Sequence, residues 1–492
     1  MFYKILKLLD FYANKLYNNI EIKKEMCDFM NNKLNKKYGL ATAICMVVGI
    51  VIGSGVFFKS QDVLKYTQGN VLIGILAWAI GGVVMIICSY NFANFATKYE
   101  RVNGVVDYAE AIVGNRYAYF IGWFVSIIYY PAMTSVLAWV SARYTLVLFG
   151  EADITSGLCM SLGTLYLVLA YTINVLSPKI AGKFQVSSTV IKLIPLAIMA
   201  IVGTIAGIIN GNTVEAFKAS TSTGGEFSSI FAAIVACAFA YEGWIIATSI
   251  NAELKDSKKN LPIALVIGTA IIAAVYIIYF ISLCGASDVN SLITKGSTQA
   301  FVKMFGNIGG TILNVFIVIS CLGTLNGLML ANTRSMYSIS VRNTGPNPKM
   351  FGEVSNSTNM PANSGALGLL ICGVWYFYFY GANLFSKPVF GTFSFDSSEL
   401  PIITLYGMYI PILLMFIKKE GKKNPIKNIV MPILGILASL FMMFAACYAH
   451  GYVPYINAQK QGNFSCPILF YLIVYVVIMG ISLIFYKNKD KK

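Results

Sequence analysis

The chain has 492 residues, of which 57% are hydrophobic and only 12% charged, and its mean hydropathy is +0.68. A soluble domain carries roughly 25% charged residues, so this composition excludes a soluble protein and indicates a polytopic membrane protein. The net charge is +16, but the basic residues are distributed over alternate loops rather than gathered on one face. This pattern is typical of membrane topology and attraction to anionic lipid, and it does not indicate nucleic-acid binding.

Stretches of about 20 apolar residues are long enough to cross the roughly 30 Å of hydrocarbon in a lipid bilayer. Twelve such spans are predicted, near 40–58, 71–96, 118–148, 157–176, 185–209, 227–250, 261–284, 299–337, 363–381, 399–417, 428–449 and 466–486. Most Lys and Arg residues fall in the segments that are cytoplasmic if the N-terminus is inside. We therefore expect a multi-pass protein of the plasma membrane with both termini in the cytoplasm.

The N-terminal segment 1–38 is rich in lysine and asparagine, and we expect no cleavable signal ahead of the first span. Phe2, Ile5, Leu8, Leu9 and Tyr12 recur at helical spacing. Two interpretations stay open: an amphipathic helix on the inner leaflet, or a partly ordered basic tail. A second, short basic tail covers 487–492.

Several chemistries are poorly served by this chain. Its ten cysteines are scattered singly without a C-x-x-C motif, so neither a disulfide framework nor a zinc site is predicted. His450 is the single histidine, so the sequence does not favour histidine catalysis, a His-ligated metal or haem. No phosphate-binding G-x-x-x-x-G-K-[ST] motif is present. We expect no catalytic residues, no metal and no cofactor.

Two glycines inside the first span mark an interruption of its helix. Gly53-Ser54-Gly55 weakens the helix at a depth where hydrocarbon offers the backbone no other partner. Broken backbone at that depth is tolerated where it is packed in protein or lines a cavity. The sixth span contains Phe239-Ala240-Tyr241-Glu242-Gly243-Trp244, in which a carboxylate costs roughly 2.5 to 3.5 kcal/mol at the span centre.

The two interruptions lie five spans apart, so the two helices enter the membrane from opposite sides. Two five-span units of opposite topology are the arrangement of inverted-repeat transporters, whose broken helices meet at the midplane. No identity between the two halves is easily visible in the sequence. The repeat is inferred from topology and from the paired interruptions.

At these residues the chain resembles the amino acid–polyamine–organocation superfamily, and within it the L-amino acid transporter type. The motifs that carry the resemblance are Gly49–Phe57, Phe239–Trp244 followed by Ala252–Pro262, Ile191-Lys192-Leu193, and Gly323–Gly327 with Arg334. The resemblance implies an all-α fold of twelve helices with a LeuT-like 5+5 inverted repeat, in which helices 1 and 6 are discontinuous. It divides the chain into a transport core at 39–417, made of repeats at about 39–209 and 227–417, and two additional helices at 428–486.

Two broken helices can bind a zwitterion without charged side chains. The free carbonyls near Val51 and Ile52 carry partial negative charge, and the free amides of Ser54, Gly55 and Val56 carry partial positive charge. We expect the substrate carboxylate on these amides and the ammonium on the carbonyls, with further carbonyls from Phe239 and Ala240. Glycine at 53 and 55 lets the ligand approach the backbone; the alternative is a small-residue packing face for a neighbouring helix.

The resemblance gives further residues a role. Phe239 resembles the family's aromatic gate, with plain core packing as the alternative. Glu242 replaces the small residue of some members; it either helps to bind the ammonium or is a hydrated carboxylate paired with a neighbour.

Lys192 lies eight residues from Phe184, about 12 Å along the helix, and the resemblance places it beside spans one and eight, where sodium-coupled relatives bind a cation. Its ammonium could replace sodium, with Thr324 as the expected neighbour; the alternative is a static ion pair. Arg143 is expected at the outer interface near Glu151 and Asp153.

The sequence thus predicts a sodium-independent secondary transporter of small L-amino acids that works by alternating access, as an exchanger (antiporter) or a proton-coupled symporter. Alternatives are a polyamine or amine antiporter, a non-transporting amino-acid sensor, a channel, or an intramembrane enzyme using Glu242, Asp107 or Glu110. Sparse carboxylates and a single histidine argue against an enzyme. Eukaryotic heteromeric members are joined to a partner through a cysteine between spans three and four. The loop near 149–156 has none, so no disulfide-linked accessory subunit is expected.

Overall fold

The fold is all-helical in the part of the chain that the computed structural model describes, which is residues 39–99, 104–151, 153, 155–222, 229–247 and 254–486. The expectations for the tails 1–38 and 487–492 lie outside these residues. The first half contains α2 (Leu40–Val51), α3 (Gly55–Tyr66), α4 (Val71–Lys98), α5 (Val105–Ile112), α6 (Asn115–Phe124), η1 (Val125–Tyr129), α7 (Tyr130–Val147), α8 (Gly157–Leu176), α9 (Pro178–Ile191), α10 (Leu193–Ile198), η2 (Met199–Gly203), α11 (Thr204–Ile209) and α12 (Asn212–Ser222).

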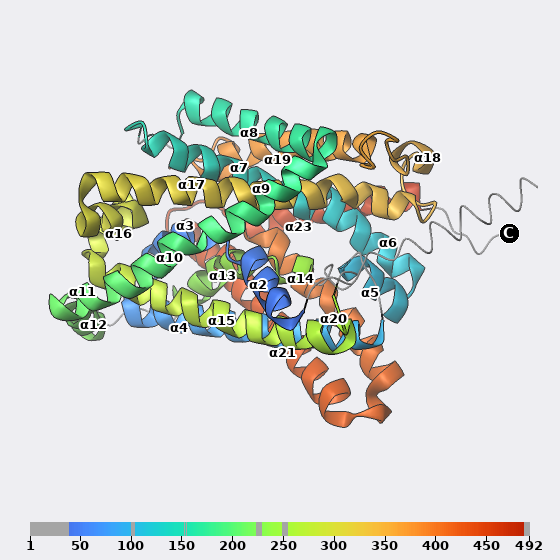
Figure 1. The fold of residues 1–492 in the computed structure, drawn as a ribbon, viewed down its shortest axis with the longest axis horizontal. Coiled ribbons are helices and arrows are strands. Elements are labelled where there is room, and N and C mark those ends of the chain that lie inside the picture. Colours follow the sequence, from blue (N-terminus) through green and yellow to red (C-terminus); the bar gives the residue numbers. More distant parts are fainter. Residues whose placement is uncertain are drawn as a thin grey trace, which may run out of the picture.

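The second half begins with two short helices and continues with long ones. It contains α13 (Ile230–Tyr241), α14 (Trp244–Ala247), α15 (Ser257–Ala286), α16 (Val289–Lys295), α17 (Ser297–Ser340), α18 (Pro348–Phe351), α19 (Ala362–Asn383), η5 (Gly391–Phe393), α20 (Leu400–Glu420), η6 (Gly421–Lys423), η7 (Ile426–Val430), α21 (Met431–Cys447), η8 (Tyr448–Tyr452), α22 (Val453–Gln459) and α23 (Pro467–Phe485). The long helices run in roughly one direction, horizontal in Figure 1.

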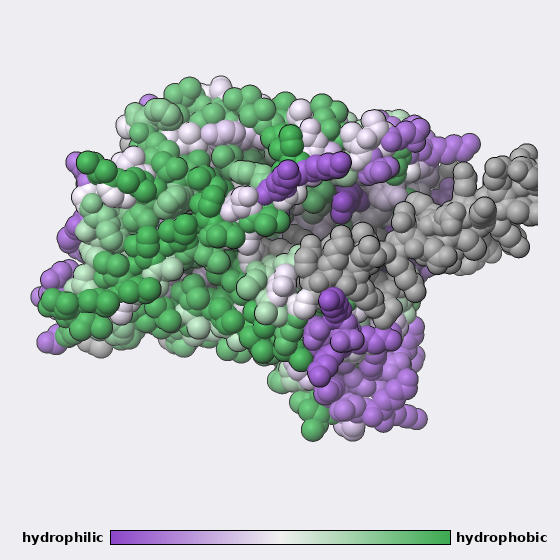
Figure 2. Space-filling model, viewed as in Figure 1, coloured by the Kyte–Doolittle hydropathy of each residue, from purple (hydrophilic) through white to green (hydrophobic). Residues whose placement is uncertain are grey.

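Ten helical segments of the described chain are long and apolar enough to cross a membrane. Two shorter apolar helices accompany them, and these are α2 and α13. They are short because each is interrupted where the sequence predicts a break. The surface over the long helices is largely hydrophobic in Figure 2, and hydrophilic residues gather towards the two ends of the bundle. This chain is therefore a multi-pass membrane protein.

The interrupted helices lie inside the bundle, and longer helices surround them. α13 packs against α3 and α4, while α15 packs against both α4 and α2. On the other side, α17 contacts α7, α8, α9 and α19. Figure 1 shows α2 next to α14, with α13 close by and α15 and α17 on either side of them. This arrangement gives both breaks a protein environment in place of lipid.

Several predicted span boundaries differ from the helix ends by up to about ten residues, because a helix can continue beyond the apolar stretch that predicts it. The fifth span begins at Pro178 instead of 185, and the eleventh runs on to Gln459 through a π-helical turn. α17 (Ser297–Ser340) extends slightly beyond the predicted span 299–337 at both ends, and within it Gly306 has a φ of 68°, which is not helical. Only glycine adopts such a φ without steric cost.

Candidate substrate site

The backbone of both interrupted helices opens at the predicted residues. α2 ends at Val51, and Ile52 is extended with φ −64° and ψ 101° before α3 begins at Gly55. α13 ends at Tyr241, one residue beyond the predicted Ala240, and Glu242 is extended with φ −72° and ψ 154°. Gly243 follows at φ 111°, a conformation that favours glycine. Each break therefore exposes the carbonyl end of one half-helix, and the first break also exposes the amide end of α3.

The carbonyl ends of the two half-helices converge on one hydroxyl group. Tyr276 of α15 lies with its hydroxyl 3.3 Å from the carbonyl oxygen of Val51 and 3.2 Å from that of Ala240. A phenol has a single proton, so it satisfies one of the two carbonyls at a time. Two partly negative helix ends consequently meet at one point, as a binding site for an ammonium requires.

The glycines of the first break also permit close helix packing. A Cβ on Gly53 would lie 2.8 Å from Oγ1 of Thr324, and a Cβ on Gly55 would lie 2.7 Å from the backbone Cα of Ala240. The second contact is with rigid backbone, so any larger residue at 55 must separate α3 from α13. The packing interpretation is thus supported for Gly55, which also lines the cavity described next.

A cavity of about 230 Å³ lies between the two breaks. It is smaller than the roughly 300–1,000 Å³ of typical sites for drug-sized ligands, a size suited to a small molecule. Its walls come from both broken helices and from η1, α7, α9 and α17. The lining residues are Val51, Gly53, Ser54, Gly55, Tyr129, Met133, Leu137, Gln185, Phe239, Ala240, Glu242, Gly243, Thr324, Gly327, Leu328 and Leu330.

Eight predicted site residues line this cavity and three do not. The eight are Val51, Gly53, Ser54, Gly55, Phe239, Ala240, Glu242 and Thr324. Ile52 and Val56 are buried at the break, with 1% and 0% of their surface exposed. Neither residue belongs to the cavity lining, although their backbone atoms belong to the same turn. Lys192 is the third residue outside the lining.

Glu242 has a hydrogen-bond partner that the sequence reasoning did not assign. The hydroxyl of Tyr129 donates to Oε1 of Glu242 over 2.5 Å. Tyr129 ends the π-helical turn η1, one residue ahead of α7, and a proline follows at 131. A proline within a tyrosine-rich span is the sequence signal that could have identified this position, since π-turns occur frequently at functional sites. The carboxylate is thus held at the cavity wall by α7's leading turn.

Two aromatic rings separate the cavity from a vestibule that Phe58, Lys59 and Arg143 line. Phe239 lines the cavity and Phe58 lines the vestibule, and their rings pack edge to face with centroids 5.2 Å apart. The ammonium of Lys59 lies 5.5 Å and 5.4 Å from the centroids of Phe58 and Phe239. The rings and the cation together close this end of the cavity.

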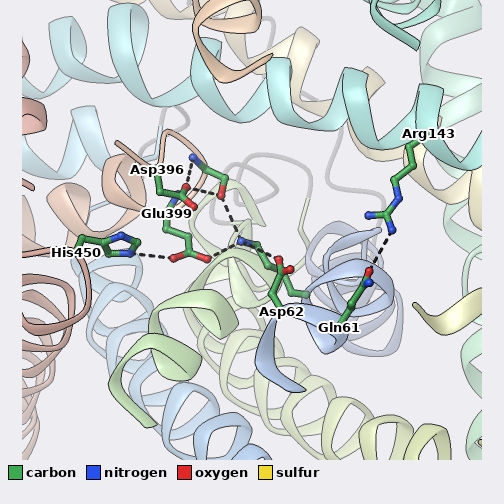
Figure 3. Close-up of polar contacts among 8 residues, drawn as sticks. Gln61, Asp62, Arg143, Asp396, Glu399 and His450 are labelled. Carbon is green, nitrogen blue, oxygen red and sulfur yellow. Dashed lines mark hydrogen bonds and ion pairs between the residues drawn. The ribbon is translucent and has the colours of Figure 1, made fainter. Parts of the chain in front are cut away.

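Lys59 is fixed by a buried polar network that joins three distant segments. Its Nζ lies 2.6 Å from Oε1 of Glu399, whose Oε2 lies 3.1 Å from Nε2 of His450 (Figure 3). Lys59 and Glu399 are only 3% and 0% exposed. Asp62 lies 3.6 Å from the same ammonium. Asp396 accepts hydrogen bonds from the backbone N–H groups of Ser398 and Glu399 at the start of α20.

Arg143 lines this vestibule together with Glu151 and Asp153, the two carboxylates expected near it. Its guanidinium, however, donates to Oε1 of Gln61 over 3.1 Å (Figure 3). No ion pair between Arg143 and either carboxylate is found among the described residues. The reason is that α7 aims the side chain at α3, across the vestibule from the loop that follows the helix.

Lys192 lies at the junction of α9 and α10 and is 1% exposed. One turn earlier, α9 meets two neighbours tightly: a Cβ on Gly49 would clash with Thr189, and one on Gly323 would clash with Ser188. Lys192 therefore lies beside α2 and α17, as expected. Within the described chain it has no ion pair, and Thr324 instead donates to the carbonyl of Ser320 over 3.0 Å. No hydrogen bond between Lys192 and Thr324 is found in that part of the chain either.

Cys159 lies in α8 and is fully buried, beyond the loop that precedes this helix. The described cysteines are all free thiols.

Comparison with known proteins adds independent information about this arrangement. Residues 38–484 match the family model described as "Amino acid permease". The serine/threonine exchanger SteT of Bacillus subtilis is 29% identical over 424 residues, which cover 84% of this chain and 91% of that protein. The mouse b(0,+)-type amino acid transporter 1 is 25% identical over 424 residues, covering 85% of this chain and 84% of the relative. The mouse Asc-type amino acid transporter 1 is 25% identical over 423 residues, or 83% and 76% of the two chains.

The family model covers both helix breaks, the surrounding bundle and nearly all of the remaining chain, so it assigns the whole transport core to one family. The relatives are amino acid transporters and not enzymes. The chain belongs to the amino acid permease family of the amino acid–polyamine–organocation superfamily.

Proposed function

We propose that the protein is a sodium-independent secondary transporter of small L-amino acids that works by alternating access. The observation that carries this proposal is the convergence of the carbonyl ends of α2 and α13, with the amide end of α3, at a cavity of about 230 Å³. A zwitterion places its ammonium and carboxylate within a few ångströms of each other. The paired helix ends offer both signs of charge at that spacing.

The substrate carboxylate binds the free amides of Ser54, Gly55 and Val56, and the ammonium binds near the carbonyls of Val51 and Ala240. Ile52 belongs to the turn that frees these groups, and Phe239 covers the bound substrate. The Glu242 carboxylate, oriented by Tyr129, contributes negative charge on the ammonium side. The small cavity favours short side chains, in keeping with a relative named as a serine/threonine exchanger.

The described conformation corresponds to a state closed to the outside and accessible from the cytoplasm. Phe58, Phe239 and Lys59 close one end of the cavity. At the other end, Gln185, Gly327 and Leu330 extend the lining along α9 and α17 towards the predicted cytoplasmic ends of these helices. This orientation of the cavity follows from twelve spans in a 5+5 inverted repeat with both termini in the cytoplasm. α21 and α23 lie outside the repeat.

Lys192 is the proposed coupling residue. Its buried ammonium, without a carboxylate partner in the described chain, lies beside α2 and α17 and takes the place of a sodium ion. The protein works in the plasma membrane, and no disulfide-linked subunit is required because Cys159 is buried in α8. Both exchange of amino acids and proton-coupled uptake fit this arrangement.

One observation favours a second substrate class. A carboxylate in the cavity wall also suits amines that lack a carboxyl group, as in a polyamine or amine antiporter. Counterflow in proteoliposomes, with a panel of the twenty amino acids and common amines, separates the alternatives. Saturable accumulation of small amino acids supports the proposal. Preference for amines supports the second class, and no accumulation of any compound indicates a sensor.

A further inference from the structure

A separate cavity, of about 590 Å³, shares no lining residue with the substrate site. It forms a groove between α6, α20, α21 and α23, and its walls are aliphatic and aromatic side chains and methionine. Residues that line it include Phe120, Met408, Met443, Leu472 and Met479. A lining of this kind at membrane depth matches the chemistry of hydrocarbon.

Among the described residues, the hydrogen bonds that fasten α23 to its neighbours lie in two places along the helix, and the groove opens between them. At one end, Trp123 donates to the carbonyl of Ile478 over 3.0 Å, and Tyr119 donates to that of Ser482 over 2.8 Å. At the other end, Thr404 and Tyr471 form a hydrogen bond of 2.5 Å. Gly407 of α20 lies between these attachments and leaves space that a side chain would fill.

The length of the groove matches one acyl chain. Ile468 and Met479 both line it, and they lie eleven residues apart on α23, about 16 Å at 1.5 Å per residue. This length is about half of the roughly 30 Å hydrocarbon thickness, which is the depth of one leaflet. The groove therefore fits the chain of one lipid rather than an aqueous solute.

A polar pocket continues the groove beyond its Met479 end. Tyr117 and Phe120 line both the groove and this polar pocket. The polar pocket is also lined by Asn115, Arg116 and Tyr486. Arg116 is exposed, and its guanidinium lies 6.0 Å from the ring centroids of Phe120 and Tyr486. Among the residues that the structure describes, no carboxylate pairs with it. Its charge is available to an anion.

The start of α6 adds further donors to this pocket. α6 begins at Asn115, so the N–H groups of its first turn have no acceptor within the helix. A phosphate at this position would meet both these amides and the Arg116 guanidinium. The apolar groove and the cationic pocket meet at Tyr117 and Phe120. A phospholipid has the same arrangement, with its apolar acyl chain joined to a charged headgroup.

From this juxtaposition we infer that the groove and the Arg116 pocket together bind one anionic phospholipid of the inner leaflet. Its acyl chain lies between α20 and α23, and its phosphate contacts Arg116. The site is independent of the substrate cavity and does not rest on the proposed transport function.

Native mass spectrometry of the full-length protein in detergent tests the inference, with dioleoylphosphatidylglycerol and dioleoylphosphatidylcholine added in equal amounts. We expect one phosphatidylglycerol to be retained preferentially. Arg116→Gln should lower that preference about fivefold, the factor expected for one interfacial cation. Gly407→Leu, which fills the groove beside the flexible Met443, should weaken binding of both lipids at this site.

Lys349→Gln is the matched control, because Lys349 is also an exposed base on the predicted cytoplasmic side but lies outside both cavities. An equal loss in this variant, or no loss in Arg116→Gln, overturns the inference. So does displacement of the lipid by glycerol 3-phosphate, which lacks an acyl chain. A protein dimer that Gly407→Leu dissociates would assign the groove to a second copy of the chain and would also overturn it. Unchanged melting temperatures verify that both variants fold.

Discussion

Glu399→Gln is expected to open the outer side of the substrate cavity, because it leaves the buried Lys59 ammonium without its closest counter-charge. The two groups are 3% and 0% exposed and 2.6 Å apart. Removing one partner of a buried ion pair costs about 3–5 kcal/mol. If the pair exists only when the outer side is closed, the closed state loses about 150- to 5,000-fold in population relative to the open one. Asp62, 3.6 Å from the same ammonium, offsets part of this loss.

A cysteine placed in the cavity reports this change. Met133 lines the cavity, and Met133→Cys in right-side-out vesicles should react slowly with a membrane-impermeant maleimide when Glu399 is present. With Glu399→Gln the reaction should be at least tenfold faster. The parent without Met133→Cys corrects for native thiols. Lys59→Met combined with Glu399→Leu removes both charges, and this pair should restore part of the slow reaction.

The matched control is Glu420→Gln, which breaks a partly exposed pair with Lys98 at 3.1 Å near the other end of the bundle. Such pairs contribute about 0–1 kcal/mol, so outer accessibility should not change. An equal acceleration by Glu420→Gln, or none by Glu399→Gln, would refute the assignment of Lys59 and Glu399 to outer closure.

Three further predictions concern the substrate site itself. Glu242→Gln should raise the KM for small neutral amino acids at least tenfold in counterflow, since hydrogen bonds to charged groups contribute about 1.5–3 kcal/mol. Tyr129→Phe should raise this KM less. An unchanged KM in Glu242→Gln would show that the residue has a structural role only. Lys192→Met should slow transport at least tenfold without lowering the melting temperature, because the ammonium has no carboxylate partner in the described chain; a wild-type rate from pH 5 to 8 would contradict the coupling role. Gly55→Ala should reduce both the melting temperature and the transport rate, because its Cβ would lie 2.7 Å from the Cα of Ala240. The control Gly39→Ala, with open space around residue 39, should change neither quantity. An unchanged melting temperature in Gly55→Ala would show that α3 and α13 can separate.

The break of the first span could be predicted to within a residue or two because its cause is local. Gly53 and Gly55 disfavour helix at any depth, and the observed helix ends at Val51 and resumes at Gly55. The second break is also local, at Glu242 and Gly243. Its helix ends one residue later than expected because Tyr241 continues α13 and packs on Trp78 and Tyr276.

The closure of the cavity could not be predicted, because it joins residues that no local pattern connects. A lysine next to a span usually keeps its charged end in solvent, so no local pattern distinguishes Lys59 from other lysines of this kind. Its partner Glu399 lies 340 residues away, and His450 lies a further 51 residues along the chain. The Tyr276 contact with two carbonyls is equally non-local. Composition and periodicity identify the broken helices, but only the packing of α15, α20 and η8 shows what surrounds them.

The contacts of α3 also restrict how the outer side can open. Gly55 packs against the backbone of Ala240, and Phe58 packs against Phe239, so α3 is fastened to α13 along one face. Lys59 fastens the same helix to Glu399 at the start of α20. Separation of α3 from α13 would disrupt the convergence of helix ends on which substrate binding depends. Opening by breakage of the Lys59–Glu399 contact preserves that convergence. The movement that admits substrate should therefore take α3 and α13 together away from α20, with His450 and Glu399 remaining paired on the other side.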